Sequence, residues 1–159
     1  MSDQTARVEA QRIIAENRKA LHDYHILETF EAGVVLQGTE VKSIRDGRVN
    51  LRDSYARVEA GEIWVYNVHI SPYANRGYAD HEPTRRRKLL LHRQEIRKLI
   101  GRTVERRMTL VPLRLYYKGG RIKLAVSLAK GKQSHDKREA IRKREVDRET
   151  RAAMKNRHR

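Results

Sequence analysis

The sequence predicts a mainly β protein, in which a small antiparallel barrel of the OB type carries short flanking helices and a basic C-terminal tail. Three observations predict this fold. Short segments with strand composition, separated by glycine-containing turns, recur between residues 17 and 130. Helix signals occur only at the joints between these segments. The apolar pattern stops after residue 130, so we expect one folded body and a tail that is disordered alone.

The N-terminal part of the chain changes from a helical to an extended pattern. Residues 1–16 have helical composition but only scattered apolar positions, so we expect a flexible arm. The folded body is expected to begin near Asn17. Residues 24–30 and 34–36 have strand composition, and Gly33 between them predicts a β-bulge.

A short helix and a hairpin are expected next. Thr39 is the predicted cap of the helix, and Gly47 is expected to end it. Residues 51–58 and 63–70 then read as two strands that pair across the turn at residues 59–62. Alternation along the second strand predicts one apolar face, formed by Trp64, Tyr66, Val68 and Ile70. This hairpin would supply one wall of the barrel.

The second half of the body repeats the scheme of loop, helix and hairpin. Residues 71–83 read as a polar loop, after which a helix capped by Thr84 and closed by Gly101 is expected. Residues 104–117 and 121–128 read as the last two strands, which turn at a glycine pair. The predicted organisation is therefore a flexible arm (1–16), an OB-like barrel (17–130) and a basic tail (131–159).

Composition narrows the class of protein. The 159 residues include 36 Lys and Arg against 20 Asp and Glu, a formal charge of +16. A surplus of this size opposes compaction unless a polyanion neutralises it. The chain has no cysteine, which excludes disulfides and fits a reducing compartment. No signal core and no apolar run of about 20 residues appears, so we expect a soluble cytoplasmic protein that binds no membrane.

The motifs of enzymes are missing. Of the seven histidines, only His22 and His25 lie close in sequence, without the spacing of a metal site. The Gly131-Lys132 pair lacks the rest of a phosphate-binding loop, and no serine occupies a nucleophile elbow. We therefore predict no catalytic residue, no metal and no cofactor. The absence of these motifs argues against an RNA-processing enzyme.

Residues 85–88 form a run of three arginines and a lysine. They would open the predicted helix, where the helix dipole disfavours positive charge, so the run suggests an external phosphate; the alternative is a solvated basic turn. Leu89 falls in the core stripe of this helix, whereas Leu91 falls on the opposite, charged side. An apolar residue there is either incidental or packs on a ribose or base.

The tail carries its own signals. Between Lys130 and Arg159 there are 12 basic and 5 acidic residues, a net charge of +7 (12 − 5). Asp136 and Glu139 have the spacing of a capping box. The apolar residues of this segment point in three directions, so a helix here cannot pack on its own barrel. We expect it to be disordered alone and to order on a polyanion; the alternative is a solubilising extension.

Nine short strings of the chain occur, in the same order, in the small protein B (SmpB) family, which the sequence closely resembles. They are residues 17–20 (NRKA), 28–33 (ETFEAG), 38–43 (GTEVKS), 53–57 (DSYAR), 69–73 (HISPY), 87–92 (RKLLLH), 110–113 (LVPL), 129–132 (AKGK) and 135–138 (HDKR). Members of this family are the SsrA-binding proteins, which bind transfer-messenger RNA (tmRNA) in bacterial trans-translation.

The resemblance implies an adaptor rather than an enzyme. An OB-like barrel would bind the tRNA-like domain of tmRNA, one protein per RNA, and deliver it to the A site of stalled ribosomes for rescue and nascent-peptide tagging. The tail would enter the small-subunit decoding centre and the empty messenger channel and become helical there. The alternative, from composition, is a structural ribosomal protein or an RNA chaperone.

The resemblance also assigns residues. Family RNA-binding positions correspond to Asn17, Glu31 and Leu91, and Glu31 would accept hydrogen bonds from base or sugar donors. With the basic neighbours, the predicted RNA-binding set of the body is Asn17, Arg18, Lys19, Glu31, Lys42, Arg45, Arg85, Arg86, Lys88, Leu91 and His92. The predicted ribosome-binding set of the tail is Lys130, Lys132, His135, Asp136, Lys137, Arg138, Arg142 and Lys143.

Overall fold

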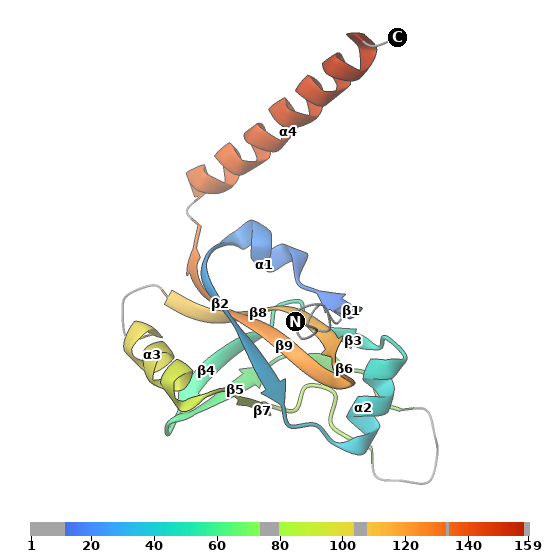
Figure 1. Ribbon diagram of the computed structural model, residues 1–159, viewed down its shortest axis with the longest axis vertical. Helices are drawn as coiled ribbons and strands as arrows, with labels where there is room; N and C mark the ends of the chain where they lie inside the picture. Colours follow the sequence, from blue (N-terminus) through green and yellow to red (C-terminus); the bar gives the residue numbers. More distant parts are fainter. Residues whose placement is uncertain (1–11, 74–79, 104–107, 133, 158–159) are drawn as a thin grey trace, which may run out of the picture.

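The computed structural model describes residues 12–73, 80–103, 108–132 and 134–157. Its strands are β1 (Arg12–Glu16), β2 (Tyr24–Val34), β3 (Val49–Asn50), β4 (Tyr55–Glu59), β5 (Glu62–Tyr66), β6 (His69–Ile70), β7 (Arg87–Leu90), β8 (Met108–Lys118) and β9 (Arg121–Gly131). Its helices are α1 (Arg18–Asp23), α2 (Gly38–Arg45), α3 (Arg93–Thr103) and α4 (Ser134–Arg157). Figure 1 shows the strands gathered in one body, with α4 extending away from it.

Six strands close into a barrel. Neighbours follow the order β8-β4-β5-β7-β2-β9, and β9 pairs back with β8, all antiparallel. The predicted antiparallel OB-like barrel is therefore confirmed. In this ring β5 and β9 are three strands apart in either direction, so they belong to opposite walls. β1 pairs with the outer edge of β8, and the short pair β3–β6 lies apart from the ring.

The interior of the barrel holds one apolar core. Its most deeply buried side chains, each at most 1% exposed, include Ile44, Leu51, Ile63, Val65, Leu89, Leu99, Leu110, Leu124, Val126 and Leu128. They come from both predicted hairpins, from β7 and from α2 and α3. Burying each such side chain contributes about 1.5–3 kcal/mol, so this core is the main source of stability of the body.

The first predicted hairpin forms, but half of its alternation is inverted. Ala60 and Gly61 make the turn with φ angles of +50° and +76°. The buried residues of β5 and the segment after it are Ile63, Val65, Val68 and Ile70. Trp64 and Tyr66 therefore face outward while Val68 and Ile70 face inward, so the prediction that the four residues share one apolar face is wrong. The cause is Asn67, whose φ of +62° interrupts the extended backbone and shifts the alternation by one residue.

The basic run does not open a helix. Arg87–Leu90 forms β7, which fills the gap between β5 and β2, and α3 begins only at Arg93 and continues past Gly101. Two neighbouring strands thus override the helical periodicity of this segment. Leu89 is buried as predicted, although in a strand. Leu91 is partly buried against the core instead of facing solvent, and Leu90, 53% exposed, is the outward residue.

Two local predictions near β2 are corrected as well. The register of β2 against β9 shifts between Ile26 and Glu28, not at Gly33. Gly33 instead allows close approach to β7, because a Cβ there would lie 3.3 Å from the Cβ of Leu90. The cap of α2 is Gln37 rather than Thr39, and its backbone N–H donates to Glu40 Oε1 at 2.8 Å. As predicted, helix α2 ends before Gly47: its last residue is Arg45, and Gly47 has a φ of +72°.

The two ends of the chain differ from a simple arm and coil. Part of the predicted arm, Arg12–Glu16, is strand β1, because β8 offers it a free edge; residues 1–11 and the predicted strand start at 104–107 lie outside the described residues. The tail forms α4, with Ile141, Val146 and Met154 exposed. Asp136 lies inside its first turn rather than at the cap. That the tail is disordered in the free protein stays a prediction.

Candidate RNA-binding surfaces

Part of the basic run serves the interior of the protein. Glu40 of α2 is fully buried and binds two arginines: Arg85 Nη2 donates to its Oε1 at 2.6 Å, and Arg87 Nε donates to its Oε2. Arg87, 1% exposed, also donates to the backbone oxygens of Val68 (2.6 Å) and Pro83 (3.1 Å). Arg87 therefore cannot meet an external phosphate, and that part of the prediction is wrong.

The charge state of Glu40 follows from these contacts. Burial would raise the pKa of its carboxyl, but hydrogen bonds from Arg85 and from the backbone of Gln37, with the charge of Arg87, hold the pKa below its ordinary value. Glu40 is thus a carboxylate that joins α2 to the start of β7 and to the segment before it. An ion pair this deep is costly to break from one side only.

The other two cations of the run lie outside the barrel. Arg86 Nη1 donates to Glu59 Oε2 at 3.0 Å, and Lys88 Nζ donates to Glu62 Oε1 at 3.1 Å. The guanidinium of Arg86 also lies over the ring of Trp64, 4.2 Å from its centroid. Unlike Arg87, both side chains are accessible to a ligand, on the outer face of β5 and β7.

Glu31 lies on the outer face of β2, the strand that pairs with β7 on the side away from β5. Tyr116 Oη donates to Glu31 Oε2 at 2.6 Å, and Lys118 Nζ lies 3.2 Å from both carboxylate oxygens. The Tyr116 hydrogen bond, opposed by burial and supported by Lys118 and Lys123, lowers the pKa of Glu31. Burial and this contact raise the pKa of Tyr116. Glu31 is therefore held as an ionised, exposed acceptor inside a cationic surrounding.

Beside Glu31 lies a hollow that we call the α2 groove, of about 390 Å³, lined among others by Arg45, Leu90, Tyr117, Arg121 and Lys123. A second hollow of about 660 Å³ shares Arg45 and Tyr117 with it and reaches Arg12. Among the described residues, these arginines and Lys123 form no ion pair. An apolar floor rimmed by unpaired cations suits a ribose-phosphate backbone with exposed bases.

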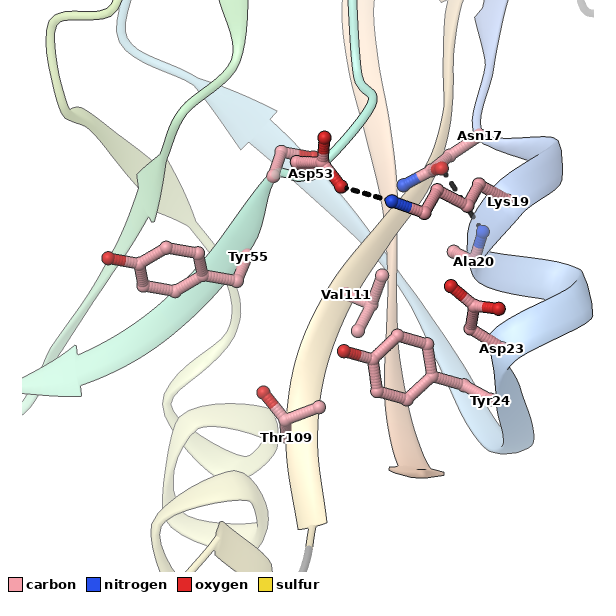
Figure 2. Close-up of a pocket in the computed structure, with 10 residues that line it drawn as sticks. Asn17, Lys19, Ala20, Asp23, Tyr24, Asp53, Tyr55, Thr109 and Val111 are labelled. Atoms are coloured by element: carbon pink, nitrogen blue, oxygen red, sulfur yellow. Dashed lines mark hydrogen bonds and ion pairs between the residues drawn. The ribbon is translucent and has the colours of Figure 1, made fainter. Parts of the chain in front are cut away.

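The α1 end of the barrel holds the first predicted residues (Figure 2). Asn17 is 4% exposed: its Oδ1 accepts from the Ala20 N–H, and its Nδ2 donates to the backbone oxygens of Leu51 and Pro112. Its amide therefore positions α1, and the adjacent cations face solvent instead. Lys19 binds Asp53 at 2.7 Å beside an open pocket of about 380 Å³.

The predicted residues therefore do not form one surface. Arg45 of α2 lines the α2 groove, and Glu31 lies beside it. Lys42, also on α2, places its Nζ 5.3 Å from the centroid of the Tyr73 ring. Arg18 is exposed near Glu16, His92 is exposed just before α3, and Arg85 is partly covered by its ion pair. Lys130 is exposed and lies one residue before the end of β9. The backbone N–H of Lys132 donates to the backbone oxygen of Asp23. Arg138, Arg142 and Lys143 are exposed on α4, which also carries His135, Asp136 and Lys137.

Sequence reasoning missed several residues of these surfaces. Lys118, Arg121 and Lys123 flank the predicted glycine turn, and strand alternation from that turn could have placed them near β2. Leu90 was missed because the segment was interpreted as a helix.

No helix in the described part of the chain has the length and apolarity needed to cross a bilayer. That same part holds no group of three or more His, Asp or Glu side chains suited to a metal ion.

The closed barrel and its separate cationic surfaces define a small OB-like barrel protein with outer walls suited to RNA. The family model described as SmpB protein matches residues 14–156. The chain therefore belongs to the SmpB family, as the resemblance predicted. The SsrA-binding protein of Carboxydothermus hydrogenoformans is 60% identical over 148 residues, 93% of this chain and 99% of its own. That of Trichormus variabilis is 56% identical over 157 residues, 98% and 99% of the two chains.

A solved structure is similar too. It is described as "tmRNA-SmpB: a journey to the center of the bacterial ribosome" and aligns with a TM-score of 0.64 at 49% sequence identity. The alignment covers 80% of this chain and 93% of the other.

Proposed function

We propose that this protein is the RNA-binding adaptor of trans-translation, which binds the tRNA-like domain of tmRNA and delivers it to the A site of stalled ribosomes. Family membership over residues 14–156, which includes both the barrel and α4, is the observation that carries the proposal. Its partners are then RNA and the ribosome, in the cytoplasm. The protein itself makes and breaks no covalent bond in this role; peptide transfer belongs to the ribosome.

The body would hold tmRNA at Glu31 and the α2 groove. The unpaired cations at Arg45, Arg121 and Lys123 can neutralise phosphates, and the exposed Leu90 can pack on a ribose or base. Glu31, fixed by Tyr116 and Lys118, presents carboxylate oxygens to base or sugar donors. Phosphate neutralisation supplies affinity, and the fixed acceptor restricts which RNA elements fit.

The tail would act on the ribosome rather than on tmRNA. Helix α4 extends away from the barrel (Figure 1) and exposes the arginines and lysines between Arg138 and Lys155. A cationic helix with no apolar face has little to bind except a polyanion. We therefore assign tmRNA binding to the body and the decoding-centre contacts to the tail.

Truncation tests this division of labour. The cut belongs after Lys132, because β9 ends at Gly131 and the Lys132 N–H still bonds to Asp23. We expect the shortened protein to remain folded and to bind the tRNA-like domain with nearly unchanged affinity in a gel-shift titration at fixed salt. The logarithm of the affinity should fall with that of the salt concentration by roughly 0.7–0.9 for each phosphate contact. Loss of most of the affinity would assign tmRNA binding to the tail instead.

Two neighbouring leucines test the position of the groove. Leu90→Asp should weaken binding of the tRNA-like domain about tenfold, because it removes an exposed apolar contact and adds a repulsive charge beside phosphates. Its melting temperature should change little. Leu91→Asp should lower the melting temperature more. Leu91 packs on the core, so the carboxylate of the introduced aspartate would be partly buried. Thermal melts and RNA titrations of both variants check this, and the reverse ranking would place the groove elsewhere.

A further inference from the structure

Tyr116 crosses the outside of the barrel to reach Glu31. Strand β9 lies between β2, which carries Glu31, and β8, which carries Tyr116 (Figure 1). Leu115 packs in the core, so the next side chain along β8 points outward. Tyr116 is nevertheless only 3% exposed, and its hydroxyl still lies 2.6 Å from Glu31 Oε2. It therefore holds the carboxylate while leaving almost no surface of its own for RNA.

The two partners of Glu31 hold it with different strength. The 2.6 Å distance from Tyr116 Oη is that of a short hydrogen bond to an ionised acceptor. Lys118 Nζ lies 3.2 Å from both carboxylate oxygens, longer than the separation of about 2.7–2.9 Å in a close ammonium–carboxylate contact. The side chains of Lys118 and Glu31 are 42% and 35% exposed, and an ion pair that water reaches contributes little. Tyr116 is therefore the firm partner and Lys118 the exchangeable one.

Lys118 has a second counter-charge within reach once RNA is bound. It pairs in register with Arg121 of β9, which lines the α2 groove. Like charges opposite each other across two strands repel, and Glu31 offsets that repulsion in the free protein. A phosphate bound at the α2 groove would offset it for both cations. Lys118 can therefore leave the carboxylate without losing its counter-charge.

We propose that RNA displaces Lys118 from Glu31, so that a base N–H or ribose hydroxyl takes its place on the carboxylate and Lys118 moves to a phosphate. Oε2 keeps its bond from Tyr116 throughout, whereas the departure of Lys118 opens Oε1 to the incoming donor. Tyr116 is then a positioning residue, which acts on RNA only through Glu31. The inference rests on the proposed function, because it takes the RNA to be the tRNA-like domain of tmRNA.

Salt dependence tests the displacement in the full-length protein. Lys118→Gln removes the ammonium group, and the tRNA-like domain is titrated over a range of salt concentrations. The slope of log affinity against log salt should become shallower by roughly 0.7–0.9, so each tenfold reduction in salt should cost the variant about fivefold to eightfold in affinity relative to the wild type. An unchanged slope would overturn the displacement.

The matched control for this variant is Lys98→Gln. It removes a similarly exposed lysine from Glu28, which lies on β2 like Glu31, three residues earlier. Because no phosphate is expected there, the slope should stay that of the wild type. Equal changes of slope in Lys98→Gln and Lys118→Gln would report bulk charge and would also overturn the proposal.

A double-mutant cycle tests the role of Tyr116. Tyr116→Phe keeps the buried ring, so the melting temperature should change little, while the tRNA-like domain should bind about tenfold more weakly. In the Glu31→Ala background the same substitution should change the affinity less than about twofold, because its target is gone. The pKa of the Glu31 carboxyl, which the Tyr116 hydrogen bond lowers, should rise in Tyr116→Phe when followed by carbon NMR. Equal losses in both backgrounds, or an unmoved pKa, would reject a positioning role.

The inference and the proposed function fail in different ways. Failure of the wild-type protein to bind the tRNA-like domain would reject the proposed function. Wild-type binding that Glu31→Ala leaves unchanged would place the RNA elsewhere and overturn the inference alone. Should Tyr116→Phe not fold, the salt slope of Lys118→Gln still decides whether the lysine is displaced.

Discussion

Replacing Glu40 with alanine should lower the free energy of unfolding by about 3–5 kcal/mol, because it leaves the buried Arg87 without a counter-charge. A loss of this size is a large part of the stability of a small domain. Urea unfolding followed by the emission of Trp64 measures it. The matched control is Glu62→Ala, which removes the exposed partner of Lys88 and should cost less than about 1 kcal/mol. Equal costs would show that the buried pair contributes no more than a surface one.

The same carboxylate predicts a pH dependence. The pKa of Glu40 lies below its ordinary value of 4.5 in the folded protein, so ionised Glu40 stabilises the fold at neutral pH. This contribution is present above pH 4.5 and is lost as the pH falls through the folded-state pKa. Glu40→Gln should therefore be less stable at pH 7 and should lose less stability between pH 5 and the acid limit. Parallel unfolding curves of the two proteins over that range would contradict the assignment.

The sequence predicted those parts of the fold that local chemistry dictates. The barrel class, both hairpin turns and the end of α2 follow from strand composition and from residues that tolerate positive φ, such as Gly61 and Gly120. The failures have two causes. Strand β7 exists because β5 and β2 leave a gap between them, and a single backbone inversion at Asn67 turned Trp64 outward. Neither cause is visible in a short window of sequence.

The candidate site was predicted in its residue types but not in its arrangement. Glu31 came only from the resemblance, since charge alone does not nominate an acid on an RNA surface. The structure gives its physical reason: a tyrosine and a lysine fix it as an acceptor. Asn17 and Arg87, in contrast, donate their hydrogen bonds to backbone oxygens inside the protein. A basic or polar residue in a motif is therefore a ligand-binding residue only where the fold leaves its donors free.

The tail gives the largest expected effect on function. Replacing Asp136, Lys137 and Arg138 together with alanine should leave binding of tmRNA intact and abolish tagging of a nascent chain on stalled ribosomes. Asp136 lies in the first turn of α4, where a negative charge favours the helix by about 0.3–1 kcal/mol. Lys137 and Arg138 would then contact ribosomal RNA phosphates. A reconstituted translation reaction with a message lacking a stop codon measures tagging, and a gel shift measures tmRNA binding.

A scrambled tail separates a structured contact from bulk charge. Permuting residues 133–159 keeps the composition and net charge but destroys the order of the first turn and of the basic residues along the helix. An extension that only raises solubility would tolerate the permutation. We expect the scrambled protein to bind tmRNA like the wild type and to fail in tagging, because helix α4 has no apolar face and only the order of its charges can match a defined RNA surface. Normal tagging by the scrambled protein would reduce the tail to a source of positive charge.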